Sequence, residues 1–332
     1  MKKFTKRKEF GIILIILIMS FILTIVSSAF LKADNIIDIL RNNAVYGIMA
    51  FGMLPVLISG GIDLSVASSI ALCAVVAGKI MTVFDTNIVI VFIISMLVGA
   101  LIGLINGLII TKLKIAPMVA TLGIMTVTLG VVLLYTGGTW ISGLPEYFKE
   151  FGMAKLGNIP TKNGLTLGIP SQVIILILSG VVTWLMLRYT LIGRGIYAIG
   201  GSEASAVRVG YNVDKIKVFI YMYSGIMTGI AAVVHTSIVQ QVDPNTFLGY
   251  ELTVISTVVI GGASTMGGVG TVLGTTFGII LMGILQNGLI LAKIPTYWQK
   301  IVMGLVILIA ISVDVINRKR EQSKLVRVDV EG

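Results

Sequence analysis

Residues 193–210 read GRGIYAIGGSEASAVRVG, a short polar stretch between two long apolar segments. The run Glu203–Val209 consists largely of small helix-forming residues, and Gly210 follows where a helix commonly ends. A helix of about this length is too short and too charged to span lipid. We therefore expect a short helix over about 201–212, preceded by a chain break at Gly200-Gly201, that lies across the inner membrane face where another protein can reach it.

The composition is that of an all-α polytopic membrane protein. Hydrophobic residues make up 56% of the 332 residues, charged residues only 12%, and the mean hydropathy is +1.01. A soluble domain of this length would need far more polar surface, so we predict a single transmembrane domain over residues 1–332. The net charge of +10 is concentrated beside apolar segments, as the positive-inside rule requires, so nucleic acid is not an expected partner.

Apolar segments predict about ten transmembrane helices. Their approximate ranges are 10–30, 42–58, 63–83, 88–110, 115–136, 170–187, 216–240, 250–262, 269–291 and 298–316. Ten spans put both termini on one side. Basic residues cluster at both termini, after the fourth span and in the loop at about 188–215, so we expect that side to be the cytoplasm. The outer loop at about 137–169, with a short amphipathic piece near 146–151, is expected to be either a partner surface or a simple connector.

The spacing of the spans suggests an internal repeat. The shift that places Asn106-Gly107 on Asn287-Gly288 also maps spans 2–5, about 42–136, onto spans 7–10, about 216–316. Five spans separate the two halves, so they have opposite orientations and form a candidate inverted repeat. Such symmetry is used for alternating access, in which a pathway between similar halves opens to one side and then to the other.

Two glycine-rich stretches interrupt apolar spans, GGIDLS at 60–65 and GGASTMGGVG at 261–270. Broken helices in lipid are tolerated where protein or water satisfies the freed backbone groups, so these breaks mark either a translocation pathway or close helix packing. We interpret Asp63 first as a structural cap for the following span and second as an ion-coupling group. The candidate pathway residues are Gly60, Gly61, Asp63, Ser65, Gly261, Gly262 and Ser264.

The sequence disfavours an enzyme. It contains no G-x-x-x-x-G-K-[ST] phosphate loop, so the chain is not expected to hydrolyse ATP, and it shows no catalytic constellation. The single cysteine, Cys73, and the single histidine, His235, exclude an intramolecular disulfide and metal sites built from several Cys or His residues. We expect no catalytic residue, no metal and no cofactor bound by this chain.

Several stretches resemble the ribose-type sugar permeases of ABC importers. Gly193-Arg194 with Tyr197–Gly201, the two glycine-rich stretches, and Pro295–Gln299 carry the likeness, while Thr136–Pro145 is closer to the autoinducer-2 and rhamnose branches. The likeness covers nearly the whole chain. It departs mildly in the inner loop, where Ser205 replaces a usual alanine and Ser202 a commoner asparagine.

The resemblance implies a set of partners and roles. A cytoplasmic ATPase subunit would use the ATP and grip the inner loop, and an extracytoplasmic solute-binding protein would deliver a small sugar. A second permease chain, the same or similar, would complete the pathway in a bacterial cytoplasmic (inner) membrane. The docking residues that it implies are Glu203, Ala204, Ala206, Arg208 and Gly210.

Two other function classes stay open on the sequence. An ion-coupled secondary transporter fits inverted repeats and broken helices equally well, and Asp63 would be its coupling group. A membrane scaffold without transport would not need spans interrupted by glycine. The identity of the sugar, and the choice between a homodimer and a heterodimer, are not encoded in any feature named above.

Overall fold

The computed structural model of the chain describes residues 8–84, 86–160 and 166–306, together with 308–309, 312 and 315–316. Its elements are α1 (Lys8–Val26), α2 (Ala33–Ile58), α3 (Val66–Val83), α4 (Ile88–Lys112), α5 (Pro117–Thr136), α6 (Glu146–Met153), β1 (Lys155–Pro160), β2 (Thr166–Pro170), α7 (Ser171–Tyr189), α8 (Leu191–Gly201), α9 (Glu203–Arg208), α10 (Val213–Val239), α11 (Tyr250–Ile260) and α12 (Val272–Leu291). Residues 296–306 are also helical.

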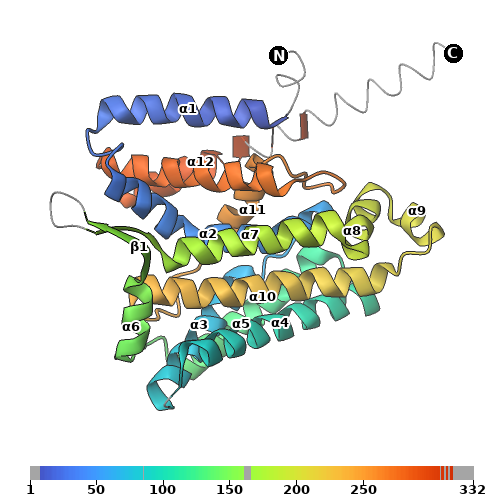
Figure 1. Ribbon diagram of the computed structural model, residues 1–332. Helices are drawn as coiled ribbons and strands as arrows, with labels where there is room; N and C mark the ends of the chain where they lie inside the picture. The colour runs from blue at the N-terminus through green and yellow to red at the C-terminus, as the bar shows by residue number, and fades with distance from the viewer. Residues whose placement is uncertain are drawn as a thin grey trace, which may run out of the picture.

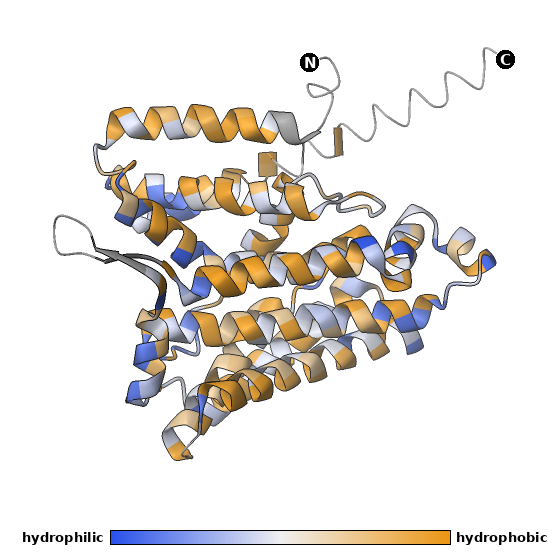
Figure 2. Cartoon of the chain, in the orientation of Figure 1, coloured by the Kyte–Doolittle hydropathy of each residue, from blue (hydrophilic) through white to orange (hydrophobic). Residues whose placement is uncertain are grey.

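The long helices lie side by side in one bundle (Figure 1). Within the described residues, six of them are long and apolar enough to cross a membrane: α3, α4, α5, α7, α10 and α12. Figure 2 shows apolar residues along the middle of the bundle and hydrophilic residues gathered near its two ends. This distribution is that of a multi-pass membrane protein, because lipid tolerates only helices whose outward surface is apolar.

Polar residues at the helix ends explain where several helices begin. The side chains of Asn87, Thr190, Asn212 and Thr271 accept hydrogen bonds from the first free backbone N–H groups of α4, α8, α10 and α12. Helix α2 begins at Ala33, well before the expected position near 42. Its first turns carry Asp34, Asp38 and Arg41, which hide the helix from a search for apolar runs.

The most extensive helix contact among the described residues is the crossing of α4 and α10. Gly99, Gly103 and Gly107 line one face of α4, and methyl groups built on Gly99 and Gly103 would overlap backbone carbonyls of α10. Ser95 lies on the same face and donates its Oγ hydrogen to the carbonyl of Gly229 at 2.8 Å. Small residues at such spacing let two helix backbones approach closely, which is how helices associate in lipid without a hydrophobic driving force.

The two ends of the bundle differ in structure. At one end, called here the hairpin end, lie α6 and the antiparallel pair of β1 and β2 (Figure 1). Helix α6 is the amphipathic piece expected near 146–151. The opposite end, called here the α9 end, carries α8 and α9. Lys112 and Lys114 lie at this end, 3.7 and 3.3 Å from Asp214 at the start of α10, so the turn after α4 and the 188–215 loop share one side as expected.

Candidate functional site

Helix α9 projects from the bundle (Figure 1). It begins after Ser202, whose Oγ accepts the backbone N–H of Ser205 at 3.2 Å. It is closed by Gly210, which has a φ of 92°, a left-handed value that glycine adopts without strain. Tyr211 N–H returns to the carbonyl of Ala206 at 3.1 Å. Both ends of α9 are therefore fixed by local hydrogen bonds, and the helix needs little packing to hold its shape.

The boundaries of this segment differ from the expectation. The chain break does not fall at Gly200-Gly201: α8 continues through both glycines, and the helix stops at Ser202, which is extended with a φ of −163°. The second helix is Glu203–Arg208, shorter than 201–212. Glycine lowers helix propensity but does not forbid a helix, and here the packing of α8 against the bundle outweighs that cost.

The predicted docking residues divide by exposure. Glu203, Ala204, Arg208 and Gly210 are exposed, whereas Ala206 is buried, with 2% of its surface accessible, and anchors α9 to the bundle. The Glu203 carboxylate lies 2.7 Å from the Lys217 ammonium on α10. This ion pair is partly exposed, so it orients Glu203 more than it stabilises the fold.

Asp63 is the centre of a buried polar network. Its Oδ1 accepts hydrogen bonds from Ser65 N–H at 3.0 Å and Ser65 Oγ at 2.6 Å, and its Oδ2 accepts one from Ser224 Oγ of α10 at 3.1 Å. Asn106 of α4 donates to Ser65 Oγ at 2.7 Å. The network joins the start of α3 to α4 and α10 through Asp63 and Ser65.

Asp63 does not occupy the capping position itself. Ser65 precedes α3 directly, and Asp63 binds Ser65 instead of an N–H group in the first turn of the helix. Asn106 and Ser224 were not singled out for this network from the sequence. The sequence signal for both residues is a polar side chain within a long apolar run, because such a side chain usually forms hydrogen bonds inside the bundle.

The two glycine-rich stretches meet in space. Gly60 has a φ of 82°, and Gly268 N–H donates to the carbonyl of Ile58 at 2.8 Å. Ser264 helps to fold the second stretch, since its N–H bonds the Val269 carbonyl at 3.0 Å and its Oγ accepts Met266 N–H at 3.2 Å. These contacts bring the stretches at 60–65 and 261–270 together at the α9 end of the bundle.

Gly261 and Gly61 serve close packing. A methyl group on Gly261 would lie 2.6 Å from the carbonyl oxygen of Gly274 on α12, and one on Gly61 would lie 2.6 Å from the Tyr221 hydroxyl. Gly262 has a φ of 89° and open space around it, so it serves the turn after α11. The close contacts at Gly61 and Gly261 therefore support the interpretation that these glycines allow close packing.

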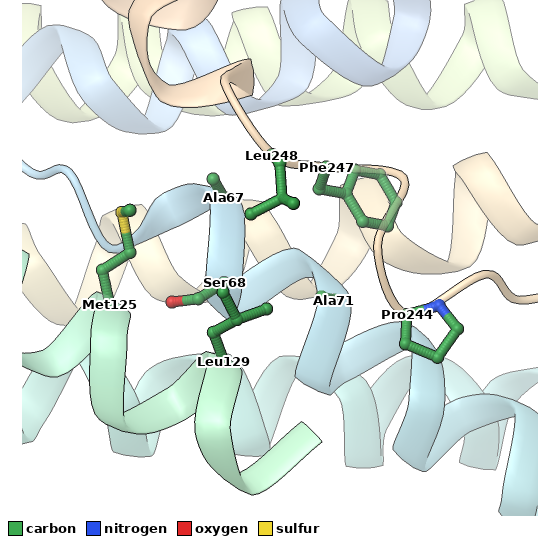
Figure 3. A pocket seen from close by; sticks show the side chains of 8 residues that line it. All are labelled: Ala67, Ser68, Ala71, Met125, Leu129, Pro244, Phe247 and Leu248. Carbon is green, nitrogen blue, oxygen red and sulfur yellow. The ribbon is translucent and has the colours of Figure 1, made fainter. Parts of the chain in front are cut away.

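Two hollows open between elements, and neither is lined by the seven candidate pathway residues. In the first, Met125 and Leu129 of α5 and Phe247 and Leu248 of the α10–α11 connection surround α3 (Figure 3). Its free volume of about 10 Å³ would hold at most a water molecule. The second, of about 250 Å³, lies at the hairpin end and is lined by Lys79, Thr82, Thr136, Thr139, Trp140, Ile141 and Ser142.

Metal chemistry has no support in the arrangement of side chains. Among the residues that the structure describes, no three His, Cys, Asp or Glu side chains gather to hold a metal ion. Cys73 is buried between helices, with its Sγ 3.4 Å from the carbonyl oxygen of Ser95.

The family follows from comparison with known proteins. Residues 35–311 match the family described as the permease component of the branched-chain amino acid transport system. The chain belongs to this permease family. It is 41% identical over 308 residues to the ribose import permease protein of Bacillus subtilis, covering 92% of each chain. It is 36% identical to the ribose import permease protein of Escherichia coli K12, again over 92% of each chain. No solved structure matches the chain.

A relative named for another solute is less similar in sequence to this chain. The chain is 32% identical to the autoinducer 2 import system permease protein of Yersinia pseudotuberculosis, over 93% of this chain and 85% of that one. The resemblance to sugar-importer permeases seen in the motifs is thereby confirmed. The chain is a multi-pass permease subunit of the ABC importer class and not an enzyme.

Proposed function

We propose that this permease is the membrane subunit of an ATP-driven importer that carries ribose or a similar small sugar across the cytoplasmic membrane. The observation that carries the proposal is α9: a short helix, fixed at both ends, that presents Glu203, Ala204 and Arg208 outward from one end of the bundle. The substrate class rests on the relatives named for ribose, which are more similar to this chain than the relative named for autoinducer 2.

The partners follow from the same reasoning. A cytoplasmic ATPase subunit would bind α9 and consume the ATP, so that this chain needs no cofactor of its own. An extracytoplasmic solute-binding protein would release sugar at the hairpin end, where Lys79 and Trp140 line a polar surface hollow. A second permease chain would supply the other wall of the pathway, since of the two hollows described above one is very small and the other lies at the surface.

We further propose ten spans with both termini on the cytoplasmic side. Helices α1, α2, α11 and the stretch from 296 would join the six long apolar helices to make ten. The basic residues before Lys8 and after residue 316 lie outside the described residues, whereas those of the turn after α4 and of the 188–215 loop, which also entered the prediction, lie at the α9 end. Helix α1 begins at the α9 end, which agrees with an inner amino terminus (Figure 1).

Two observations support the inverted repeat of about 42–136 and 216–316. The first is the pattern of helix contacts: α4 packs on α10 as α12 packs on α2, and α3 contacts α4 and α10 as α11 contacts α12 and α2. The second is a matching turn. Lys114 after α4 and Lys293 after α12 have φ values of 54° and 56°, unusual for a residue that is not glycine, and each precedes an isoleucine and a nearby proline.

For the pathway we propose that Gly60, Gly61, Asp63, Ser65, Gly261, Gly262 and Ser264 shape its inner end through the backbone and the Asp63 network. They would act by setting the positions of α2, α3 and α11, and not by binding sugar directly. The rival ion-coupled transporter would need Asp63 to exchange a cation. Ser65 and Ser224 each donate a hydrogen bond to one oxygen of Asp63, which favours the structural role.

The function is tested by uptake into vesicles that contain the permease, its ATPase and its binding protein. D-ribose should accumulate only with ATP and only with the ATPase present. Uptake driven by a proton or sodium gradient without the ATPase would refute the proposal and support the ion-coupled alternative.

Docking is tested separately by Glu203→Lys. The variant loses an exposed ion pair of about 0.2–1 kcal/mol, so the bundle should still fold. We expect the ATPase to stop co-purifying with the variant. Lys215→Glu, a charge change of equal size and opposite sign at the start of α10, is a control in the same region, and it should retain the ATPase. Unchanged co-purification of Glu203→Lys would remove the docking assignment.

A further inference from the structure

Three segments that are far apart in the sequence meet backbone to backbone near the end of α8, next to α9. They are the end of α2 at Ile58–Gly61, the end of α8 at Gly200, and the α11–α12 connection at Gly267–Gly268. A methyl group on Gly200 would overlap both the Ile58 carbonyl oxygen and the Gly268 amide nitrogen. One on Gly267 would lie 2.9 Å from Gly60 N and 3.1 Å from the Gly200 Cα. We call this contact the glycine junction.

The junction leaves no side chains between the three backbones. Side chains can change rotamer and absorb a small displacement, but carbonyl and amide groups in direct contact cannot. The hydrogen bond from Gly268 N–H to the Ile58 carbonyl, at 2.8 Å, further ties α2 to the α11–α12 connection. Any movement of the end of α8 must therefore be passed on to both neighbours or break the contact.

A second tie lies one turn earlier on α8. Tyr197 Oη donates to the carbonyl of Gly270 at 2.8 Å. Burial raises the pKa of the Tyr197 phenol, so the hydroxyl keeps its proton and remains a donor. Gly270 itself packs against Ile58, since a methyl group there would lie 2.7 Å from the Ile58 Cγ1 atom. The second tie thus holds the same three segments.

Helix α8 is joined to α9 by a single residue, Ser202. The N–H of Ser202 still bonds the Ala198 carbonyl of α8 at 3.0 Å, and its carbonyl accepts Ala206 N–H of α9 at 2.9 Å. This link is too short and too well bonded to act as a loose hinge. A displacement of α9 is therefore a displacement of α8.

We propose that α9, α8, the end of α2 and the 261–271 connection form one rigid transmission block. A displacement of α9 would then move both halves of the bundle together. It would reach the first half through α2 and the second half through the connection between α11 and α12. This inference rests on the proposed docking of an ATPase on α9. Gly200 and Tyr197 are its positioning residues, because they hold α8 against the other two segments.

Spin-label distances in the complex with the ATPase test the block directly. Leu191 at the start of α8, Met266 in the connection and Leu113 after α4 are exposed to nearly equal extents, at 68%, 68% and 67%, so each can carry a label in place of its side chain. Between the nucleotide-free and AMP-PNP-bound states, the 191–266 distance should stay constant while the 191–113 distance shifts. An equal shift in both pairs, or no shift in either, would overturn the proposal.

The contacts themselves are tested by Tyr197→Phe and Gly200→Ala, with Gly201→Ala as the matched control. Gly201 is the next residue of α8, and a methyl group there meets nothing within 4 Å. The control should behave as the wild type, whereas the other two variants should bind the ATPase but show a nucleotide-dependent change in the 191–266 distance. If Gly200→Ala does not fold, Tyr197→Phe decides the question, and a constant distance in it would overturn the proposal.

Failure of ATPase docking and failure of the transmission block give different experimental results. Loss of the ATPase from the wild-type chain would refute the docking function and the transmission block together. An ATPase that binds normally to Tyr197→Phe, with wild-type distances, would refute the block alone.

Discussion

Substitution of Gly103 by alanine should loosen the α4–α10 crossing. The added methyl group would overlap the Tyr221 carbonyl and lie 2.8 Å from the Met222 Cα. Unbonded carbon atoms prefer about 3.5–4.0 Å, so the two helices must separate by roughly 1 Å. Overpacking of this kind costs about 1–3 kcal/mol, and the better helix propensity of alanine returns up to about 1 kcal/mol. Because the methyl group would meet backbone atoms, which cannot change rotamer, the cost lies in the upper part of this range, and the net loss should be about 1–2 kcal/mol.

The assay is the unfolding midpoint of the purified permease in mild detergent. Gly123→Ala on α5 is the matched control, because it is also a helical glycine and a methyl group there meets nothing within 4 Å. The control should keep or slightly raise the midpoint, while Gly103→Ala lowers it. Equal midpoints for the two variants would refute the claim that glycine spacing on α4 sets the helix separation.

Further predictions concern the buried network and the orientation of the chain. Ser224→Ala removes the hydrogen bond to Asp63 Oδ2 and should lower the unfolding free energy by about 1–3 kcal/mol. Thr126→Ala is the control and should cost little, because its exposed hydroxyl bonds only its own helix; equal losses for the two variants would contradict the network. In intact cells, a cysteine in place of Leu156 should react with an impermeant maleimide, and one in place of Val209 should react only after the membrane is opened. The reverse pattern would place α9 on the outer side.

Much of the helical architecture could be predicted from the sequence because lipid imposes it. Apolar runs of sufficient length must be helices, and their ends were found within a few residues for α3, α4, α5 and α12. Helix α9 was predictable because its signals are local: a serine that can cap it, a glycine that ends it and small residues between.

The sequence did not predict the contacts between segments that are far apart in the chain. The start of α3, α4 and α10 meet through Asp63, Asn106 and Ser224, and no local pattern says which polar side chains will find one another. The burial of Ala206, one of five predicted docking residues, follows from how α9 lies against the bundle. The sequence draws attention to Gly200 as one of two adjacent glycines. It does not show that Gly200 packs against α2 and the α11–α12 connection, because these segments are distant in the chain.

The central claim is that α9 receives the ATPase, and cross-linking from its exposed tip tests it most directly. A photoreactive amino acid at Val209, 77% exposed at the end of α9, should cross-link to the ATPase subunit in cells, and one at Leu156, 65% exposed on β1, should not. Cross-links to the ATPase from position 156, or their absence at 209 in a complex that still hydrolyses ATP during uptake, would contradict the account.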